Sequence, residues 1–211
     1  ITVKWAPARE NKESGRALSA TMNRGARRAA TITKAGVIPA TLEFLDNTTI
    51  NAVEDFKQIG LPREAGAILL IETDGIREAA MREIERVESI CLANQALTVR
   101  KARDEAERET LWQARRAALS ALARIRPTTI LEDATVPRSQ VPAMVRGVSE
   151  IAEKYAIKIG NFGHAGDGNL HPTILTDQRD KVEFARVEKA IEEIFDLALR
   201  LGGTISGEHG I

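Results

Sequence analysis

The chain has 211 residues, 43% of them hydrophobic, which is enough to build the core of one large domain or two small ones. Basic and acidic residues number 30 each, so the formal net charge is zero. This balance gives no electrostatic reason to expect nucleic acid or an anionic membrane as a partner. No apolar run approaches the roughly 20 residues that a transmembrane helix needs.

The single cysteine bears on the redox compartment, and the two ends of the chain bear on whether the sequence is a whole protein. Cys91 is the only cysteine, which fits a reducing compartment, and its apolar helical position predicts a core residue. The chain starts without Met in a strand-like run, residues 1–5, and stops in a glycine-rich run, residues 206–211. We therefore expect a fragment of a longer protein.

Hydrophobic periodicity and turn residues predict the elements in chain order. The first hundred residues are expected to form a strand at 1–6, a helix at 14–35, a strand at 38–46, a short helix at 49–58, a strand at 66–73, a helix at 76–93 and a strand at 96–100. On the helix at 14–35, Arg24, Arg27 and Arg28 are expected to form one solvated face. After a linking helix at 104–125, the pattern predicts a strand at 128–135, a helix at 139–155, strands at 156–163 and 170–175, a helix at 179–201 and a strand at 203–206.

Both halves of the chain follow the order strand, helix, strand, strand, helix, strand, apart from the short helix in the first half. This is the order of a ferredoxin-like unit. The sequence therefore predicts an α+β fold in which two ferredoxin-like units share one large, mostly antiparallel sheet with helices packed on it.

The three histidines, His164, His171 and His209, all lie in the last 48 residues. Residues 166–169, Gly-Asp-Gly-Asn, favour a tight turn over a helix. If they form a four-residue hairpin loop, His164 pairs with His171 across the strands, and two imidazoles so placed can hold one divalent ion. The alternative is two polar residues on a solvated hairpin.

A third candidate ligand is Glu208, which precedes His209. Two histidines and one carboxylate leave open positions on a metal, which is the composition of a catalytic site. Neighbouring side chains of an extended chain point in opposite directions, so Glu208 and His209 are expected to have different roles.

Residues 163–171 read Gly-His-Ala-Gly-Asp-Gly-Asn-Leu-His, and residues 202–210 read Gly-Gly-Thr-Ile-Ser-Gly-Glu-His-Gly. These runs resemble the two signatures of the C-terminal domain of FAD-linked oxidases, a family that includes the glycolate oxidase FAD-binding subunit, D-lactate dehydrogenases and D-2-hydroxyglutarate dehydrogenase. The runs at 38–46, 69–75, 112–115 and 132–139 agree with it. The resemblance covers essentially the whole chain, 1–211, as one domain that lacks the preceding FAD-binding domain.

The resemblance implies a role for each candidate residue. His164, His171 and Glu208 match metal ligands, for Zn, Mn or Fe. His209 matches the base that takes the substrate hydroxyl proton, and Arg115 matches an arginine that binds the substrate carboxylate. Asn169 is a candidate for contact with flavin or substrate. Leu119 and Leu131 depart from residues of some relatives, so the identity of the hydroxy acid is not carried over.

The resemblance implies a flavin-dependent dehydrogenase or oxidase that converts a small 2-hydroxy acid to a 2-keto acid with hydride transfer to FAD. The expected partners are the FAD-binding domain of the same protein and electron-acceptor subunits. The expected location is the cytoplasm, with any membrane association through partners, and the isolated chain is expected to be colourless and inactive. Two alternatives are a zinc-dependent hydrolase and a non-catalytic ferredoxin-like metal-binding module.

Overall fold

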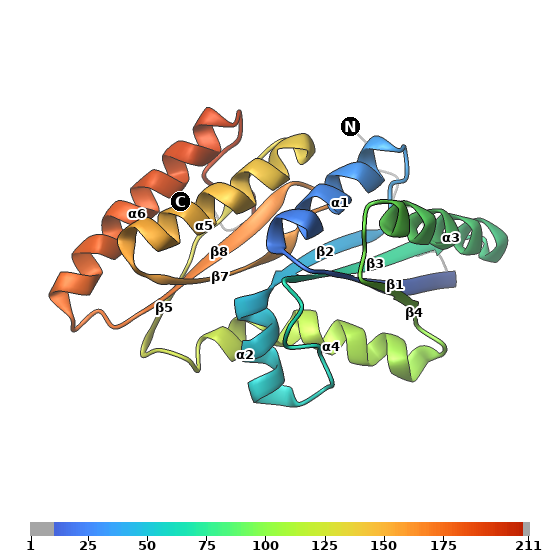
Figure 1. Ribbon diagram of the computed structural model, residues 1–211, viewed down its shortest axis with the longest axis horizontal. Helices are drawn as coiled ribbons and strands as arrows, with labels where there is room; N and C mark the ends of the chain where they lie inside the picture. The colour runs from blue at the N-terminus through green and yellow to red at the C-terminus, as the bar shows by residue number, and fades with distance from the viewer. Residues whose placement is uncertain (1–10, 209–211) are drawn as a thin grey trace, which may run out of the picture.

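A computed structural model describes residues 11–208 and shows one sheet covered by helices on both faces (Figure 1). The elements of the first half are β1 (Asn11–Ser19), α1 (Met22–Lys34), β2 (Thr41–Asp46), α2 (Asn47–Lys57), β3 (Ala67–Gly75), α3 (Arg77–Ala93) and β4 (Thr98–Lys101). After the linking helix α4 (Glu105–Leu122), the second half contains β5 (Thr128–Leu131), β6 (Ala134–Thr135), the 3-10 turn η1 (Arg138–Gln140), α5 (Val141–Tyr155), β7 (Lys158–His164), β8 (Asn169–Thr176) and α6 (Lys181–Arg200).

The strands form one eight-stranded sheet in the order β4-β1-β3-β2-β7-β8-β5, with β6 also paired to β8. All of the pairings are antiparallel. The four strands β4-β1-β3-β2 have the spatial order of a ferredoxin-like unit, and β7, β8 and β5 form the sheet of the second unit. The two units join where β2 pairs with β7, which confirms the expected α+β fold with one shared sheet.

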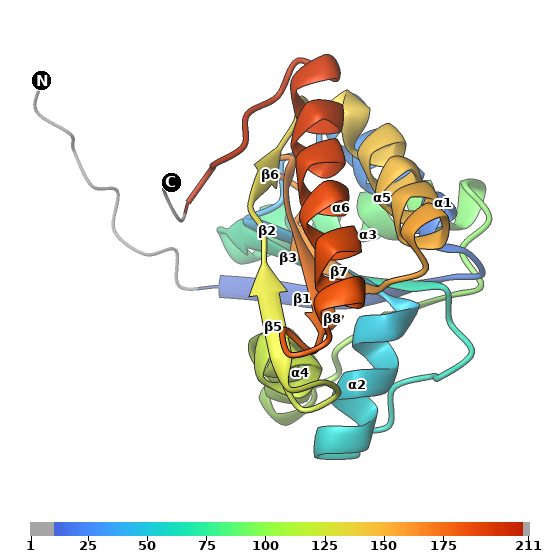
Figure 2. The ribbon, with the colours of Figure 1, turned by 90° about the vertical axis from the view of Figure 1, so that its left-hand side faces the viewer.

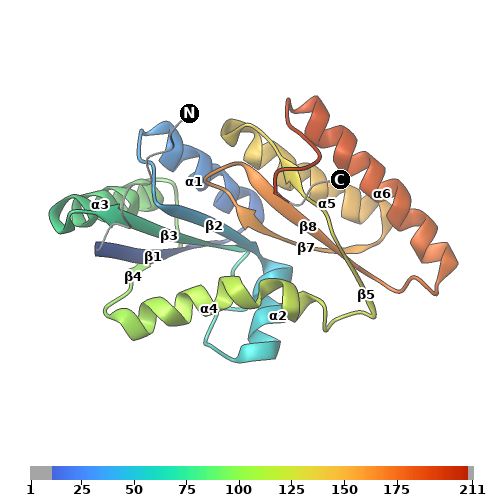
Figure 3. The ribbon, with the colours of Figure 1, turned by 180° about the vertical axis from the view of Figure 1, so that it is seen from behind.

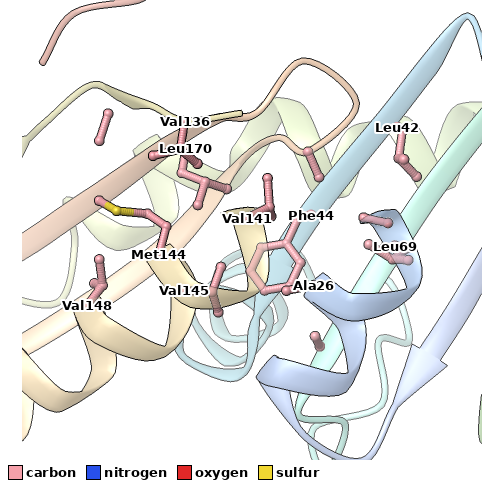
Figure 4. Packing of buried hydrophobic residues seen from close by; sticks show 14 of the residues in the cluster. Ala26, Leu42, Phe44, Leu69, Val136, Val141, Met144, Val145, Val148 and Leu170 are labelled. Carbon is pink, nitrogen blue, oxygen red and sulfur yellow. The ribbon is translucent and has the colours of Figure 1, made fainter. Parts of the chain in front are cut away.

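Two helical layers of unequal size cover the sheet. The helices α1, α3, α5 and α6 lie on one face, and α2 and α4 lie on the other (Figures 1 and 3). Alternate strand residues supply the two cores, because side chains of a strand point to opposite faces. Phe44 and Leu69 pack against α1 and α5 in the larger core (Figure 4), whereas Leu45 and Leu70 pack on the α2 and α4 side.

Side-chain caps set the beginning of several helices. Thr21 caps α1 and accepts a hydrogen bond from the backbone N–H of Arg24. Asp46, Asp104 and Asp180 cap α2, α4 and α6 in the same way. These short oxygen-bearing side chains satisfy backbone N–H groups that have no partner within the helix. Within residues 11–208, no helix has both the length and the apolar character needed to cross a bilayer.

The helix predicted over 14–35 is wrong in its first part. Residues 14–19 belong to β1, which lies between β3 and β4, and the helix begins only at Met22. Pairing with strands on both sides outweighs the local helix preference of this segment. Arg28 is also buried rather than solvated, and its guanidinium donates to the backbone carbonyls of Asn94 and Gln95 at the end of α3.

The other differences concern the ends of the second unit. The predicted strand at 128–135 is divided into β5 and β6, which pair with different parts of β8. The predicted strand at 203–206 is reduced to one bridge between Thr204 and Thr135. Figure 2 shows β5 and β6 along this edge of the sheet, with α6 beside them. The predicted strand at 1–6 lies outside the described residues.

Candidate metal and substrate site

The hairpin of β7 and β8 carries both described histidines, but its predicted register is wrong. His164 pairs with Asn169, and His171 pairs with Phe162, so the turn consists of residues 165–168. Gly168 ends the turn one residue earlier than predicted with φ +82°, and the N–H of Asp167 donates to the carbonyl of His164. The register shift is two residues, and strand side chains alternate with period two, so both histidines still face the same side of the sheet.

The two histidines and Glu208 converge on one point. The rings of His164 and His171 have centroids 5.5 Å apart and planes at 88°. The Nε2 atom of His164 lies 3.3 Å from Glu208 Oε1, and the Nε2 atom of His171 lies 3.9 Å from Glu208 Oε2. One potential ligand atom from each residue lies within 4.8 Å of the other two. This donor set fits a small divalent cation between the three side chains.

The segment that carries Glu208 is held against the sheet by Asp133. One oxygen of Asp133, Oδ2, accepts hydrogen bonds from the N–H groups of Gly207 at 2.7 Å and Glu208 at 2.6 Å. A Cβ atom on Gly207 would lie 2.2 Å from Thr135 Oγ1 and 2.9 Å from Asn169 Nδ2. The close approach therefore requires glycine at 207, and this approach brings Glu208 to the histidines.

Arg115 reaches the same place from α4. Its Nε donates to Glu43 Oε2 at 2.5 Å, and its Nη2 lies 3.3 Å from His164 Nε2. The guanidinium lies over the ring of Phe162, with 5.0 Å between its carbon and the ring centroid. The side chain is 17% exposed, whereas the neighbouring Arg116 points outward and pairs with Glu109 on the helix surface. The site therefore contains one partly accessible guanidinium beside the potential ligands.

The two histidines have opposite electrostatic environments. Hydrogen bonding to Glu43 raises the pKa of His164 above its ordinary value. Burial, followed by the positive charge of Arg115, lowers the pKa of His171 to about 4. The His171 ring is therefore neutral at pH 7, which is the state that binds a metal ion.

The remaining predicted site residues have different outcomes. His209 lies outside the described residues. Asn169 is 3% exposed and faces the side of the sheet that carries His164 and His171, and its Oδ1 accepts no hydrogen bond from the described part of the chain. The exposed Asp167 lies in the turn at 165–168, whereas Asn169, the last residue of the predicted turn at 166–169, begins β8.

Three residues of this site were not found by reasoning from the sequence, namely Glu43, Phe162 and Asp133. Glu43 carried a detectable signal, because it is a charged residue inside the otherwise apolar strand β2 and is only 2% exposed. Buried charges are retained in proteins where they are paired. Phe162 and Asp133 gave no comparable signal.

The fold and the cluster define the class of the domain, which is an α+β domain of two ferredoxin-like units with ligand-type side chains on one face of a shared sheet. The family described as "FAD linked oxidases, C-terminal domain" matches residues 9–211. The chain belongs to this family.

Two curated relatives are glycolate oxidase subunits. The chain is 53% identical over 209 residues to the glycolate oxidase subunit GlcD of Bacillus subtilis, covering 99% of this chain and 44% of the relative. It is 44% identical over 176 residues to the GlcD subunit of Escherichia coli K12, covering 83% of this chain and 35% of the relative. The chain thus spans less than half the length of these relatives.

A third relative and a solved structure extend the comparison. The D-lactate dehydrogenase of Anaerostipes hadrus is 31% identical over 184 residues, which is 82% of this chain and 38% of the relative. The 4-ethylphenol oxidase of Gulosibacter chungangensis has a TM-score of 0.65 at 13% identity, covering 95% of this chain and 46% of that chain. The similarity to the 4-ethylphenol oxidase concerns the fold alone.

Proposed function

We propose that this domain forms the substrate side of a flavin-dependent dehydrogenase or oxidase that converts a small 2-hydroxy acid of the glycolate or D-lactate type to a 2-keto acid. The observation that carries the proposal is the distance of 3.3 Å between Arg115 Nη2 and His164 Nε2. A 2-hydroxy acid has its carboxylate and hydroxyl on adjacent carbons, so its recognition requires a carboxylate-binding group beside a hydroxyl-binding group. The names of the glycolate oxidase and D-lactate dehydrogenase relatives support this substrate class.

The reaction would need two cofactors, a hydride acceptor and a Lewis acid, in addition to the residues of this chain. FAD, bound mainly by another domain of the full-length protein, supplies the hydride acceptor, because no amino-acid side chain can accept a hydride. A divalent ion such as Zn²⁺, Mn²⁺ or Fe²⁺, held by His164, His171 and Glu208, supplies a Lewis acid that lowers the pKa of the substrate hydroxyl.

The protein residues bind the substrate and accept its proton. Arg115 binds the substrate carboxylate, because a guanidinium presents several N–H donors in a plane that matches a carboxylate. His209 accepts the hydroxyl proton as general base, since a neutral imidazole accepts protons near pH 7. Asn169 offers an amide for contact with flavin or substrate. His171 is neutral at pH 7, and it therefore presents a lone pair to a cation without first releasing a proton.

In the full-length protein, the domain would act together with another domain and with other subunits. Its first partner is the FAD-binding domain of the same protein, and its further partners are subunits that accept electrons from the flavin. The proposed location is the cytoplasm, with any membrane association through those partners.

The test is anaerobic reduction of the flavin in the full-length protein. Mixing the oxidised protein with glycolate or D-lactate should bleach the flavin absorbance. Methyl glycolate is the matched control, because it keeps the hydroxyl but has no carboxylate charge for Arg115, and it should reduce the flavin far more slowly. Failure of a panel of small 2-hydroxy acids to reduce the flavin would reject the proposed function.

A further inference from the structure

One buried carboxylate connects the two halves of the candidate site. Glu43 on β2 is 2% exposed, and its two oxygens contact different groups. Oε1 lies 2.6 Å from Nδ1 of His164, and Oε2 accepts a hydrogen bond from Nε of Arg115 at 2.5 Å. Glu43 therefore contacts a candidate metal ligand and the candidate substrate-binding arginine at the same time.

The position of Glu43 follows from the junction of the two ferredoxin-like units. Glu43 is the direct cross-strand partner of His164 in the β2–β7 pairing. Its neighbours Leu42 and Phe44 point into the core on the opposite face, so Glu43 faces α4. Arg115 extends from α4 over this pair. The carboxylate thus lies where both units and the covering helix meet.

The hydrogen bonds around His164 select one form of its ring. A carboxylate oxygen can only accept, so Nδ1 of His164 must carry the proton that is shared with Glu43. The Nη2 group of Arg115 can only donate, so Nε2 of His164 must present a lone pair to it. The contacts with Glu43 and Arg115 specify the same tautomer. Glu208 Oε1, 3.3 Å from this Nε2, is also an acceptor, and a cation between the two atoms would satisfy both of their lone pairs in this tautomer. Metal-binding histidines generally donate their other ring N–H to a carboxylate or carbonyl group.

We propose that Glu43 is a positioning residue that holds His164 in the Nδ1–H tautomer, with Nε2 directed at the cation, and holds the guanidinium plane of Arg115 beside it. This inference rests on the proposed metal and substrate site. Both oxygens of Glu43 are occupied by His164 and Arg115, so Glu43 would act on cation and substrate through these two neighbours. Glu43 thereby fixes the position of the cation site at His164, which would bind the substrate hydroxyl, relative to Arg115, which would bind the substrate carboxylate.

The variant Glu43→Gln separates this role from simple filling of space. Glutamine has nearly the same shape but only one acceptor oxygen, and its amide nitrogen only donates. If the Gln oxygen faces Arg115, the amide nitrogen donates to Nδ1 of His164 and favours the other tautomer. If the oxygen faces His164, the amide nitrogen opposes the Nε–H of Arg115. Glutamine therefore cannot satisfy both partners.

Glu72 provides a matched control. It is a second buried carboxylate, 4% exposed, on β3 and on the same face of the sheet. It contacts Lys12 and Ser14, and it accepts a hydrogen bond from Nε1 of Trp112, three residues before Arg115 on α4. The variant Glu72→Gln removes a comparable buried charge beneath the same helix without altering a contact of His164.

The experiment uses the full-length protein labelled with nitrogen-15 histidine, with the His164 signals assigned through His164→Ala. At a pH high enough for the His164 ring to be neutral, imidazole nitrogen shifts of the metal-free wild type should show the Nδ1–H tautomer. Glu43→Gln should shift this ring toward the Nε2–H tautomer, and Glu72→Gln should leave it unchanged. In a titration with Co²⁺, Glu43→Gln should bind the ion about 10–100-fold more weakly, the usual effect of losing such a partner, whereas Glu72→Gln should match the wild type.

The outcomes distinguish the two proposals. An unchanged tautomer together with unchanged Co²⁺ affinity in Glu43→Gln would overturn the positioning role. Equal losses of Co²⁺ affinity in Glu43→Gln and Glu72→Gln would also overturn the positioning role, because they would show a general effect of removing a buried charge. If the wild type bound no Co²⁺ while the tautomer still depended on Glu43, the metal site would be rejected and the role of Glu43 in orienting His164 supported.

Discussion

His171 lies diagonally across the β7–β8 ladder from His164, and the Nε2 atoms of both rings approach the carboxylate of Glu208. Diagonal neighbours on one face of a sheet are farther apart than direct partners, at about 7–8 Å between Cα atoms. The extra distance leaves room for an ion between the rings, whose centroids are 5.5 Å apart. Loss of either ring should therefore leave the cation with only two of the three potential protein ligands.

We expect His171→Ala in the full-length protein to lose both bound metal and turnover, because it removes one of three potential protein ligands. His209→Ala is the comparison, and it should keep the metal but lose about 10²–10⁴-fold in rate, the usual contribution of a positioned base. Metal content by elemental analysis and turnover with the preferred hydroxy acid would check both. Full metal content and normal turnover in His171→Ala would show that the metal assignment is wrong.

The order of the elements was predictable from the sequence because the amphipathic helices α3, α4 and α6 and the apolar strand β3 carry strong local patterns. The segment 14–19 was not predictable in this way. Its Ser, Gly and Ala residues have no strand pattern of their own, and they adopt a strand because β3 and β4 pair with them on both sides. Only contacts distant in the sequence determine that structure.

The part of the candidate site that could be predicted consists of residues whose side-chain chemistry itself points to metal or substrate binding. His164, His171, Glu208 and Arg115 carry recognisable chemistry, and the structure brings all four together. Glu43 and Asp133 act on these residues from positions distant in the sequence, and such contacts depend on how β2 meets β7 and how the C-terminal segment returns to the sheet. Sequence periodicity does not encode either relationship.

Arg115→Lys should weaken substrate binding and leave the fold intact. Lysine keeps the charge but replaces the planar fork by a single ammonium group, which cannot bind Glu43 and a substrate carboxylate in the same geometry. We expect KM to rise about 10–100-fold, because a charge-assisted hydrogen bond contributes about 1.5–3 kcal/mol. Arg116→Lys is the matched control on the exposed side of α4 and should leave KM unchanged. Equal KM values for the two variants would contradict the assignment of Arg115.

Asp133→Asn should weaken metal binding through the position of Glu208. Asp133 Oδ2 accepts both the Gly207 and the Glu208 N–H groups, and an amide in its place loses the charge that strengthens these bonds. We expect at least a tenfold loss of Co²⁺ affinity in the full-length protein, with the β7–β8 hairpin unaffected. Glu132→Gln, at the adjacent position, is the control. If both variants bind Co²⁺ like the wild type, Glu208 is held in place by other contacts.

Gly168→Ala should destabilise the hairpin more than Gly36→Ala destabilises the end of α1. Both glycines have positive φ, +82° and +75°, so both variants carry the backbone cost of about 1–2 kcal/mol. A Cβ on Gly168 would also lie 2.0 Å from the carbonyl oxygen of Val136, whereas a Cβ on Gly36 would meet nothing within 4 Å. Urea unfolding should show a further loss of about 1–3 kcal/mol for Gly168→Ala, the typical cost of overpacking. Equal losses would show that the Val136 contact relaxes easily.

Asp46 should make the stability of the domain depend on pH. Burial raises the pKa of Asp46 from 3.8 to about 6, despite hydrogen bonds from the N–H groups of Thr49 and Asn161 that act in the opposite direction. The folded state therefore binds this proton more tightly than the unfolded state. By linkage, the contribution of Asp46 to the free energy of unfolding falls as the pH rises from about 4 to about 6 and is constant above that range.

Asp46→Asn removes this titration. Relative to the wild type, the variant should gain up to roughly 3 kcal/mol in free energy of unfolding between pH 4 and pH 7, at about 1.4 kcal/mol for each pKa unit. Comparing urea unfolding of both proteins at the two pH values isolates this term, because other titrating groups cancel. Asp104→Asn, at the exposed N-cap of α4, reports the cost of changing a cap without burial. A stability difference between wild type and Asp46→Asn that stays constant from pH 4 to pH 7 would show that burial does not hold the proton on Asp46.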